Sequence, residues 1–525
     1  MPENAVETKK APNLKANVVF NLVRTHALTI LSFLTFPYVT RALGDEVFGL
    51  YTWANAFVYY FIVLARISIP NIAIRDCAKV KDDKEKFSNC VQKYFLIQAA
   101  MTLVSFGLLC SLVFAVPSLR EHSALIFLLS INFLAGVFSF EWVYVALEKH
   151  VYITVRSVLL IAFSALLTFI FIKTMTRYQD SVGNWVYPAY DELYVYALIA
   201  ILSTILTSVF NMLLLPKYVS FRKTMPWNFK SMLKPLVILA LISFALTVYN
   251  QTDEFILGYI DPTKAAVGAY SVGVKGIDVV IILIISLYTV FMPRAAYYYS
   301  KENKYYYQNL INYSFSLTFF IAIPAIATMA TMSRPITFLI SGDGTEQYLN
   351  ADLILSLLCP MMLTYSLCDN IYTEIFIPQK KEKYYLISVG VGVILNIGLS
   401  LLFGIVGSKY LGIDPAVGIA LGTMVADIVV LALCIILSKK YALKAIFNLN
   451  NLKILLLGLA IGVLSYFVYP LLETYLPVEG KEAKMLLSLL LMVFADAIIY
   501  LGGLLLLRER LLSSALLKKK EEPHE

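Results

Sequence analysis

Fourteen apolar segments, each about 20 residues long, follow one another along this chain of 525 residues and restrict its fold more than any other feature. A helix needs about that length to cross the hydrocarbon core of a bilayer. The sequence therefore predicts an all-α integral membrane protein with fourteen transmembrane helices. The segments lie at 16–40, 47–69, 90–115, 123–146, 151–172, 192–215, 235–259, 265–292, 309–332, 351–377, 384–406, 415–437, 452–471 and 484–507. The segment at 351–377 carries two acidic residues and is also compatible with two shorter helices.

The basic residues between these segments predict the topology. Most of the 43 lysine and arginine residues fall on one side of the membrane when the N-terminus is placed in the cytoplasm. Cytoplasmic loops carry such an excess of positive charge, and a missed or additional span would invert the pattern. Both termini, 1–15 and 508–525, are therefore predicted to be cytoplasmic tails. Because the net charge of +8 is spread between apolar segments and forms no single patch, it does not indicate nucleic-acid binding.

Two turns of the sequence resemble each other. LGDEVFGLY (43–51) follows the first predicted span and LGYIDPTKAAVGAY (257–270) follows the seventh. Six spans separate the turns, so the two copies have the same orientation, which predicts a parallel repeat. The repeat implies an N-terminal lobe at 16–220 and a C-terminal lobe at 221–445, each of six helices, followed by two more helices at 446–507. Short Gly-x-Tyr motifs at helix ends, unrelated to any repeat, are the alternative explanation.

Five basic residues lie inside predicted spans or at their margins. Arg24 and Lys275 lie near the middle of the first and eighth spans, and Arg66 lies in the cytoplasmic third of the second. A charge in hydrocarbon costs roughly 3 kcal/mol or more. These three side chains are therefore predicted to face a cavity, a partner or a substrate. Lys93 and Arg156 lie closer to the cytoplasmic side and are predicted to extend to the membrane surface.

Acidic residues also occur in predicted spans. A buried carboxylate can carry a proton or bind a cation, or it can simply accept hydrogen bonds between helices. Asp278 lies one helical turn after Lys275, so these two side chains can also pair with each other. The candidates for coupling or gating are Asp253, Glu254, Asp278, Asp369, Asp427 and Asp496. The expected coupling ion is H⁺ or Na⁺, and neither a metal site nor another cofactor is predicted.

The sequence contains no phosphate-binding GxxxxGKS loop, no HExxH motif and no long outside loop with paired carboxylates. These absences argue against an ATP-driven pump and against an enzyme.

Three stretches of the chain resemble a known family. FPYVTRALGDEVFGLYTWANAFVYYF (36–61), IAIRDCAKVKDD (72–83) and the stretch 249–298, which begins YNQTDEFILGYIDPTKAAVGAY, are similar to the Wzx-type polysaccharide flippases. That family belongs to the multidrug/oligosaccharidyl-lipid/polysaccharide (MOP) superfamily, together with the lipid II flippases and the MATE drug exporters. The resemblance implies two six-helix lobes around a central cavity. It also implies transfer of undecaprenyl-diphosphate-linked oligosaccharides across a bacterial cell membrane for capsule, exopolysaccharide or other surface polysaccharide synthesis.

The resemblance also implies roles for the three basic residues. The lipid II flippases carry cavity-facing basic residues on spans one, two and eight, which are the spans of Arg24, Arg66 and Lys275. These residues would bind the diphosphate or sugar of a polyprenyl-linked oligosaccharide. The other implied partners are membrane lipid and the polysaccharide polymerase and glycosyltransferases of the same pathway. The alternatives are a MATE-like small-molecule antiporter, which would favour an acidic cavity, a lipid II flippase and a membrane glycan polymerase.

Overall fold

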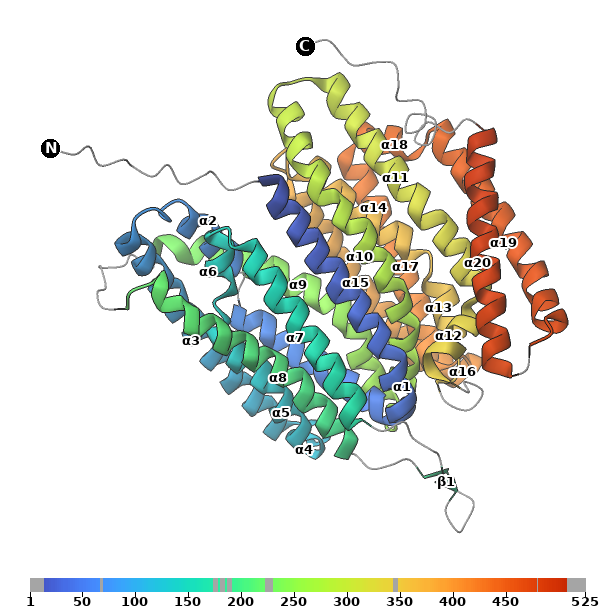
Figure 1. The fold of residues 1–525 in the computed structure, drawn as a ribbon, viewed down its shortest axis with the longest axis horizontal. Coiled ribbons are helices and arrows are strands. Elements are labelled where there is room, and N and C mark those ends of the chain that lie inside the picture. Colours follow the sequence, from blue (N-terminus) through green and yellow to red (C-terminus); the bar gives the residue numbers. More distant parts are fainter. Residues whose placement is uncertain are drawn as a thin grey trace. The chain divides into compact units, whose positions relative to one another are not determined.

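Nearly every described residue lies in a helix, as the computed structural model shows (Figure 1). The structure describes residues 14–66, 69–172, 178–179, 185–186, 191–221, 230–342, 348–478 and 480–507. Within these residues, twelve helices are long and apolar enough to cross a membrane. The two strands of this part, β1 (Tyr178–Gln179) and β2 (Trp185–Val186), form a short antiparallel hairpin. The prediction of an all-helical membrane protein is confirmed.

The helices vary from single turns to more than fifty residues. In chain order they are α1 (Leu14–Arg66), α2 (Ile69–Ala78), α3 (Lys84–Ala115), α4 (Pro117–Glu121), α5 (Ser123–Gly136), α6 (Glu141–Ala146), α7 (His150–Phe171), α8 (Asp191–Leu214), α9 (Lys230–Ile260), α10 (Ala265–Ser300), α11 (Lys304–Thr331), α12 (Ser333–Ser341), α13 (Ala351–Leu358), α14 (Met361–Ile371), α15 (Glu382–Leu401), α16 (Ser408–Leu411), α17 (Pro415–Ser438), α18 (Lys440–Ile446), α19 (Leu449–Tyr475) and α20 (Lys481–Leu506). Short 3-10 turns lie at Val137–Ser139 and Leu215–Lys217, and π-helical turns lie at Tyr372–Phe376 and Leu402–Gly407.

The structure has twelve candidate spans where the sequence predicts fourteen, and two helices, α1 and α9, account for the difference. The helix α1 is 53 residues long but is interrupted at Gly44, whose φ of 76° and ψ of 172° are not helical. The predicted span 16–40 lies in α1 before that interruption, and the predicted span 47–69 begins in α1 after it and extends past its end at Arg66. The predicted span 235–259 falls within α9, which is not among the twelve candidates because the side chains of 230–242 lie outside the described part.

The predicted span at 351–377 consists of two helices. The chain turns at Cys359 and Pro360, between α13 and α14, and a π-helical turn follows at Tyr372–Phe376. Proline has no backbone N–H and cannot continue the hydrogen-bond ladder of a preceding helix. The segment Ala351–Phe376 is nevertheless one candidate span, divided at Pro360 into two helices.

The described residues form two compact units. The first contains the residues up to 32 together with 61–171 and 196–243, and the second contains 33–60, 172–195 and the chain from 244 onward. In the first unit, a core around Ile69, Phe87 and Trp142 joins α2, α3 and α6. Exposed leucines on the outer faces of the long helices, such as Leu103 and Leu159, are suited to contact with lipid.

In the second unit, a core around Tyr307, Phe315 and Phe376 joins α11 to the π-helical turn after α14. The helices α19 and α20 lie side by side (Figure 1) and pack on α11. A glycine allows this approach, since a Cβ at Gly458 of α19 would overlap the Cγ2 atom of Ile323 in α11. Close contact through small residues is the usual way in which helices associate within a membrane.

Candidate functional site

The predicted fourth span, 123–146, is broken near its C-terminal end, within the first unit. The helix α5 ends at Gly136, a 3-10 turn follows, and Phe140 takes a left-handed conformation with φ of 44° before α6 begins. Irregular backbone at membrane depth needs other hydrogen-bond partners. Two side chains of α8 supply them, since Ser208 donates to the carbonyl oxygen of Ala135 at 2.8 Å and the Asn211 amide donates to that of Ser139.

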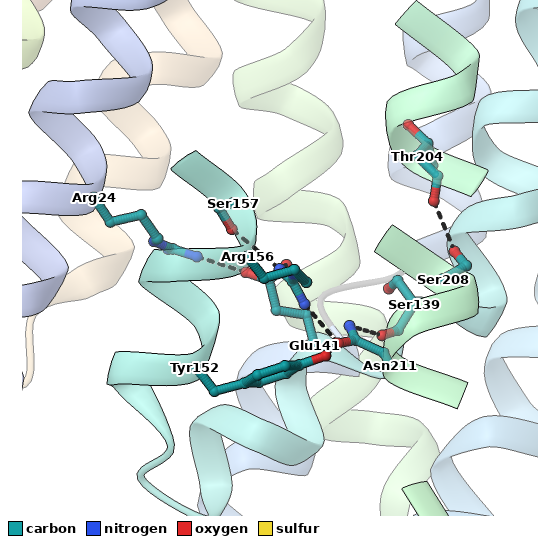
Figure 2. A network of polar contacts seen from close by, with 9 residues as sticks. All are labelled: Arg24, Ser139, Glu141, Tyr152, Arg156, Ser157, Thr204, Ser208 and Asn211. Carbon is teal, nitrogen blue, oxygen red and sulfur yellow. Dashed lines mark hydrogen bonds and ion pairs between the residues drawn. The ribbon is translucent and has the colours of Figure 1, made fainter. Parts of the chain in front are cut away.

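Two arginines converge on the first residue after this break. Arg24 of α1 lies 2.6 Å from one carboxylate oxygen of Glu141, and Arg156 of α7 lies 2.9 Å from the other (Figure 2). The Arg156 side chain is 5% exposed, whereas that of Arg24 is 25% exposed. With two guanidinium groups and one carboxylate, the cluster keeps one net positive charge, and Arg24 is its accessible cation.

Asn211 holds the inner end of this cluster. Its side-chain oxygen accepts hydrogen bonds from Arg156 at 2.6 Å and from the Tyr152 hydroxyl at 2.8 Å (Figure 2). Its backbone oxygen accepts another from the Tyr144 hydroxyl. The network therefore ties α1, α6, α7 and α8 together and fixes Arg156 in one orientation.

The prediction that Arg156 extends to the membrane surface is wrong. Its two Nη atoms donate to Asn211 and Glu141 inside the unit, and its Nε atom is buried without a partner among the described residues. Glu141 is 15 residues from Arg156 in sequence and lies beyond a helix break. That separation has no helical periodicity, and the pairing therefore gave no signal in the sequence.

The three predicted cations are not all in one unit. Arg66 lies beside the same helix break as Arg24, because its Nη2 atom is 3.9 Å from the position that a Cβ at Gly136 would take. Lys275 belongs to α10 in the second unit. Within the described residues, Lys275 forms no ion pair with Asp278, so the predicted pairing of these two side chains is not present. A cavity shared by all three cations remains a prediction.

Asp253 has the most hydrogen-bond donors among the predicted acidic residues. Its Oδ2 atom accepts from the Tyr270 hydroxyl at 2.6 Å and from Thr423 at 2.7 Å, and its Oδ1 atom accepts from Ser400 at 3.3 Å. The residue is 5% exposed. Asn396 donates to the Thr423 hydroxyl at 2.9 Å and completes the group. Oxygen atoms of this kind are the ligands that hard cations prefer.

The neighbouring acidic residues have fewer partners. Glu254 accepts a hydrogen bond from Ser271 at 2.8 Å. Asp427 accepts from the Tyr249 hydroxyl and, at 3.0 Å, from Thr364.

The remaining two predicted acidic residues differ from each other. Among the residues that the structure describes, the Asp369 carboxylate has no ion-pair or hydrogen-bond partner. Asp496 of α20 accepts from Ser465 of α19 at 2.8 Å and from Thr328 of α11 at 3.0 Å. These hydrogen bonds link α20 to α19 and to α11. Across the described ranges, no three His, Cys, Asp or Glu side chains are grouped as metal ligands.

Helices that are broken at membrane depth, with charged groups enclosed beside the breaks, are the architecture of membrane transporters. The comparisons with known proteins agree. The model of the family described as "Polysaccharide biosynthesis protein" matches residues 14–298, more than half of the chain, and this protein belongs to that family. The family model MatE matches residues 239–402. The predicted family is thus confirmed, and it is a family of transporters and not of enzymes.

Individual relatives are distant. A putative O-antigen transporter of Escherichia coli K12 is 26% identical over 162 residues, which are 31% of this chain and 39% of that protein. The match thus spans less than half of the relative's length.

Among solved structures, an inward-facing MATE multidrug transporter of the MOP superfamily has a TM-score of 0.57 at 15% identity, covering 82% of this chain and 95% of that one. A MOP superfamily transporter of Pyrococcus furiosus, reported with a binding pocket of reversed polarity, has a TM-score of 0.55 at 17% identity, covering 83% and 97%. These likenesses confirm a MATE-like fold.

Proposed function

We propose that this protein moves an undecaprenyl-diphosphate-linked oligosaccharide from the inner to the outer leaflet of a bacterial cell membrane. We infer fourteen spans with both termini in the cytoplasm, and alternating access as the mechanism. The glycan would be used for capsule, exopolysaccharide or other surface polysaccharide, made with a polymerase and glycosyltransferases of the same pathway. The observation that carries this proposal is the paired arginine cluster at the broken helix of the first unit.

The cluster has the chemistry that a diphosphate requires. Arg24 is partly exposed and already donates to a carboxylate, and the planar guanidinium group binds phosphate oxygens in the same geometry. Glu141 therefore occupies the place that a substrate oxygen would take. Arg156 remains bound to Glu141 and Asn211, so the carboxylate keeps a partner when Arg24 turns to the substrate. Arg66 and Lys275 are the further cations assigned to the same headgroup.

The proposed coupling site is the Asp253 group of the second unit. Three hydroxyl groups donate hydrogen bonds to this carboxylate. The carboxylate can instead take up a proton, or it can bind Na⁺ together with the oxygen atoms of these hydroxyl groups. Glu254, Asp278, Asp369 and Asp427 are assigned to coupling or gating with less support. Asp496 is assigned instead to holding α19 and α20 against α11, because all of its partners come from those helices.

Deletion of the gene tests the proposed function directly. We expect lipid-linked oligosaccharide to accumulate in the inner leaflet and surface glycan to be lost. Arg24→Gln should have the same effect, and Arg24→Lys should retain part of the transport. Glutamine is preferred to glutamate because Glu141 lies 2.6 Å away, and a second carboxylate there would disturb the fold. Arg120→Gln is the matched control, since the one described partner of its guanidinium group is the carbonyl oxygen of Phe114.

Two results would contradict the proposal. One is normal surface glycan in the deletion strain together with new sensitivity to cationic drugs, which would favour a small-molecule antiporter. The other is full transport by an Arg24→Gln protein that is present at the normal level.

A further inference from the structure

A cavity of about 520 Å³ lies within the second unit, at the end where α10 finishes and where α11 and α19 begin. Its volume falls within the range of ligand sites, about 300–1,000 Å³. All ten residues that line it are uncharged. Three tyrosines and four asparagines supply most of its polar groups: Tyr298, Tyr306, Tyr313, Asn309, Asn312, Asn448 and Asn450.

Internal hydrogen bonds hold one wall of this cavity in place. The buried Ser316 hydroxyl donates to the side-chain oxygen of Asn451 at 2.8 Å, and the Asn451 amide donates to the Ala445 carbonyl oxygen at 2.8 Å. Asn448 caps α19 by accepting from the Asn451 backbone N–H at 2.9 Å. The start of α19 is therefore fixed against α11, so the wall is formed before any ligand binds.

Other polar groups of the cavity are free to bind a ligand. The side chains of Asn309 and Asn450 make no hydrogen bond to any residue that the structure describes. Asn312 uses its oxygen to accept from Gln308 at 2.8 Å, which leaves its NH₂ group available. Each amide offers donors and acceptors side by side, and this combination matches the hydroxyl groups of a sugar.

The tyrosine rings offer aromatic faces on which the apolar face of a sugar can pack. Tyr306 and Tyr313 are 54% and 48% exposed. Tyr306 stacks on Tyr298 with ring centroids 5.7 Å apart and 21° between the planes, and Tyr313 meets Phe291 at its edge. The negative face of an aromatic ring attracts weakly positive C–H groups, which a pyranose ring presents on its flat face.

The absence of charge narrows the ligand class. Basic side chains are the strongest side-chain partners of a phosphate group, and none lines this cavity. A neighbouring cavity of about 550 Å³ shares Tyr298 and is lined by the charged side chains of Glu302, Lys304 and Lys380. The two cavities therefore differ in charge, and the first suits a neutral, hydroxyl-rich ligand.

We propose that the neutral cavity is a carbohydrate-binding site that takes sugar residues of the transported glycan. This origin of the sugar rests on the proposed function, whereas the binding of a carbohydrate rests on the cavity alone. The ends of α10, α11 and α19 that form the cavity carry Lys301, Lys304 and Lys453 and face the cytoplasm in the predicted topology. The site would hold the glycan on the side where the lipid-linked substrate is made.

Saturation-transfer NMR on the purified full-length protein in nanodiscs tests this site. The probes are free glucose, galactose and N-acetylglucosamine, with glycerol 3-phosphate as the anionic comparison. We expect at least one sugar to bind, and Asn309→Ala combined with Asn450→Ala to weaken its binding about tenfold through two lost hydrogen bonds. Tyr313→Ala should also weaken binding. The control is Tyr466→Ala, an exposed tyrosine of α19 that does not line the cavity.

Three results would overturn the carbohydrate site: no sugar signal with the wild-type protein, a sugar signal that the asparagine and Tyr313 variants leave unchanged, or binding of glycerol 3-phosphate alone. The outcome is separable from that of the proposed function. Arg24→Gln should abolish transport and leave sugar binding intact. If the deletion strain fails to accumulate lipid-linked oligosaccharide, the proposed function fails while the NMR result still decides the site.

Discussion

Gly49 and Gly268 pack backbone against backbone, at matching positions of the two similar turns of the sequence. A Cβ at Gly49 would overlap the carbonyl oxygen of Lys264 and stand 2.8 Å from the backbone nitrogen of Gly268. A Cβ at Gly268 would overlap the carbonyl oxygen of Asp45 and stand 3.1 Å from its carbonyl carbon. Lys264 precedes Gly268 by four residues, and Asp45 precedes Gly49 by four. The contact is therefore reciprocal, as a two-fold relation between the turns requires.

Gly49→Ala and Gly268→Ala should each destabilise the protein. The neighbouring atoms belong to the backbone and cannot rotate away, so the added methyl group must displace a helix, at about 1–3 kcal/mol. Thermal unfolding of the purified protein in detergent measures the effect. The matched control is Gly390→Ala, because nothing lies within 4 Å of a Cβ at that position of α15. Equal melting temperatures for Gly49→Ala and Gly390→Ala would show that the close approach is not important for stability.

The spans were predictable because length and hydrophobicity alone decide whether a segment can cross a bilayer. The similar turns were visible because each uses glycine at a point where two backbones meet. The partners of the charged residues were not predictable. Arg24 and Glu141 are 117 residues apart, and the break at Phe140 uses a left-handed residue that is not glycine. Thr423 and Tyr270 are hydroxyl residues in apolar segments, where such residues are too common to mark a site.

Glu141→Gln should destabilise the first unit. The change removes the only carboxylate that the described residues place against Arg24 and Arg156. The Glu141 side chain is 35% exposed, so solvent screens part of its attraction to the arginines. The loss should therefore be about 1–3 kcal/mol, below the cost of breaking a fully buried pair. Arg156→Met in the same chain removes the buried charge that Glu141 compensates, so the double variant should recover part of the lost stability. A strictly additive loss in the double variant, measured by unfolding in detergent, would show that the two side chains do not interact.

Asp253→Asn should make transport independent of the driving ion. Asparagine keeps the shape of the side chain but has no negative charge, so it cannot exchange a proton or Na⁺. The measurement is lipid-linked oligosaccharide transfer in inverted membrane vesicles, with and without an imposed gradient of H⁺ or Na⁺. Asp496→Asn makes the same chemical change at a carboxylate that links α11, α19 and α20, and it should leave the gradient dependence unchanged. A normal response to both gradients in Asp253→Asn would remove this residue from the coupling mechanism.

The ionised Asp76 carboxylate should stabilise the folded protein, and this stabilisation should be lost in acid. It lies in α2, outside the candidate spans, and accepts from the Tyr94 hydroxyl at 2.7 Å and from Lys79 and Arg75 at 3.1 and 3.2 Å. Partial burial tends to raise the pKa of this carboxyl, but these hydrogen bonds and the Arg75 charge outweigh it and lower the pKa below the ordinary 3.8. A carboxylate with a lowered pKa stabilises the folded state above its unfolded pKa, and the gain is lost as pH falls through the folded value.

Asp76→Asn should therefore melt at a lower temperature than the wild type from pH 7 down to about pH 4, and the difference should shrink at lower pH. Asparagine keeps a similar size and loses only the charge, so the pH dependence isolates the ionised form. Asp82→Asn is the control, since no residue that the structure describes donates to its carboxylate or pairs with it. A difference between Asp76→Asn and the wild type that stays constant to pH 3 would mean that the side chain acts through its shape and not through its charge.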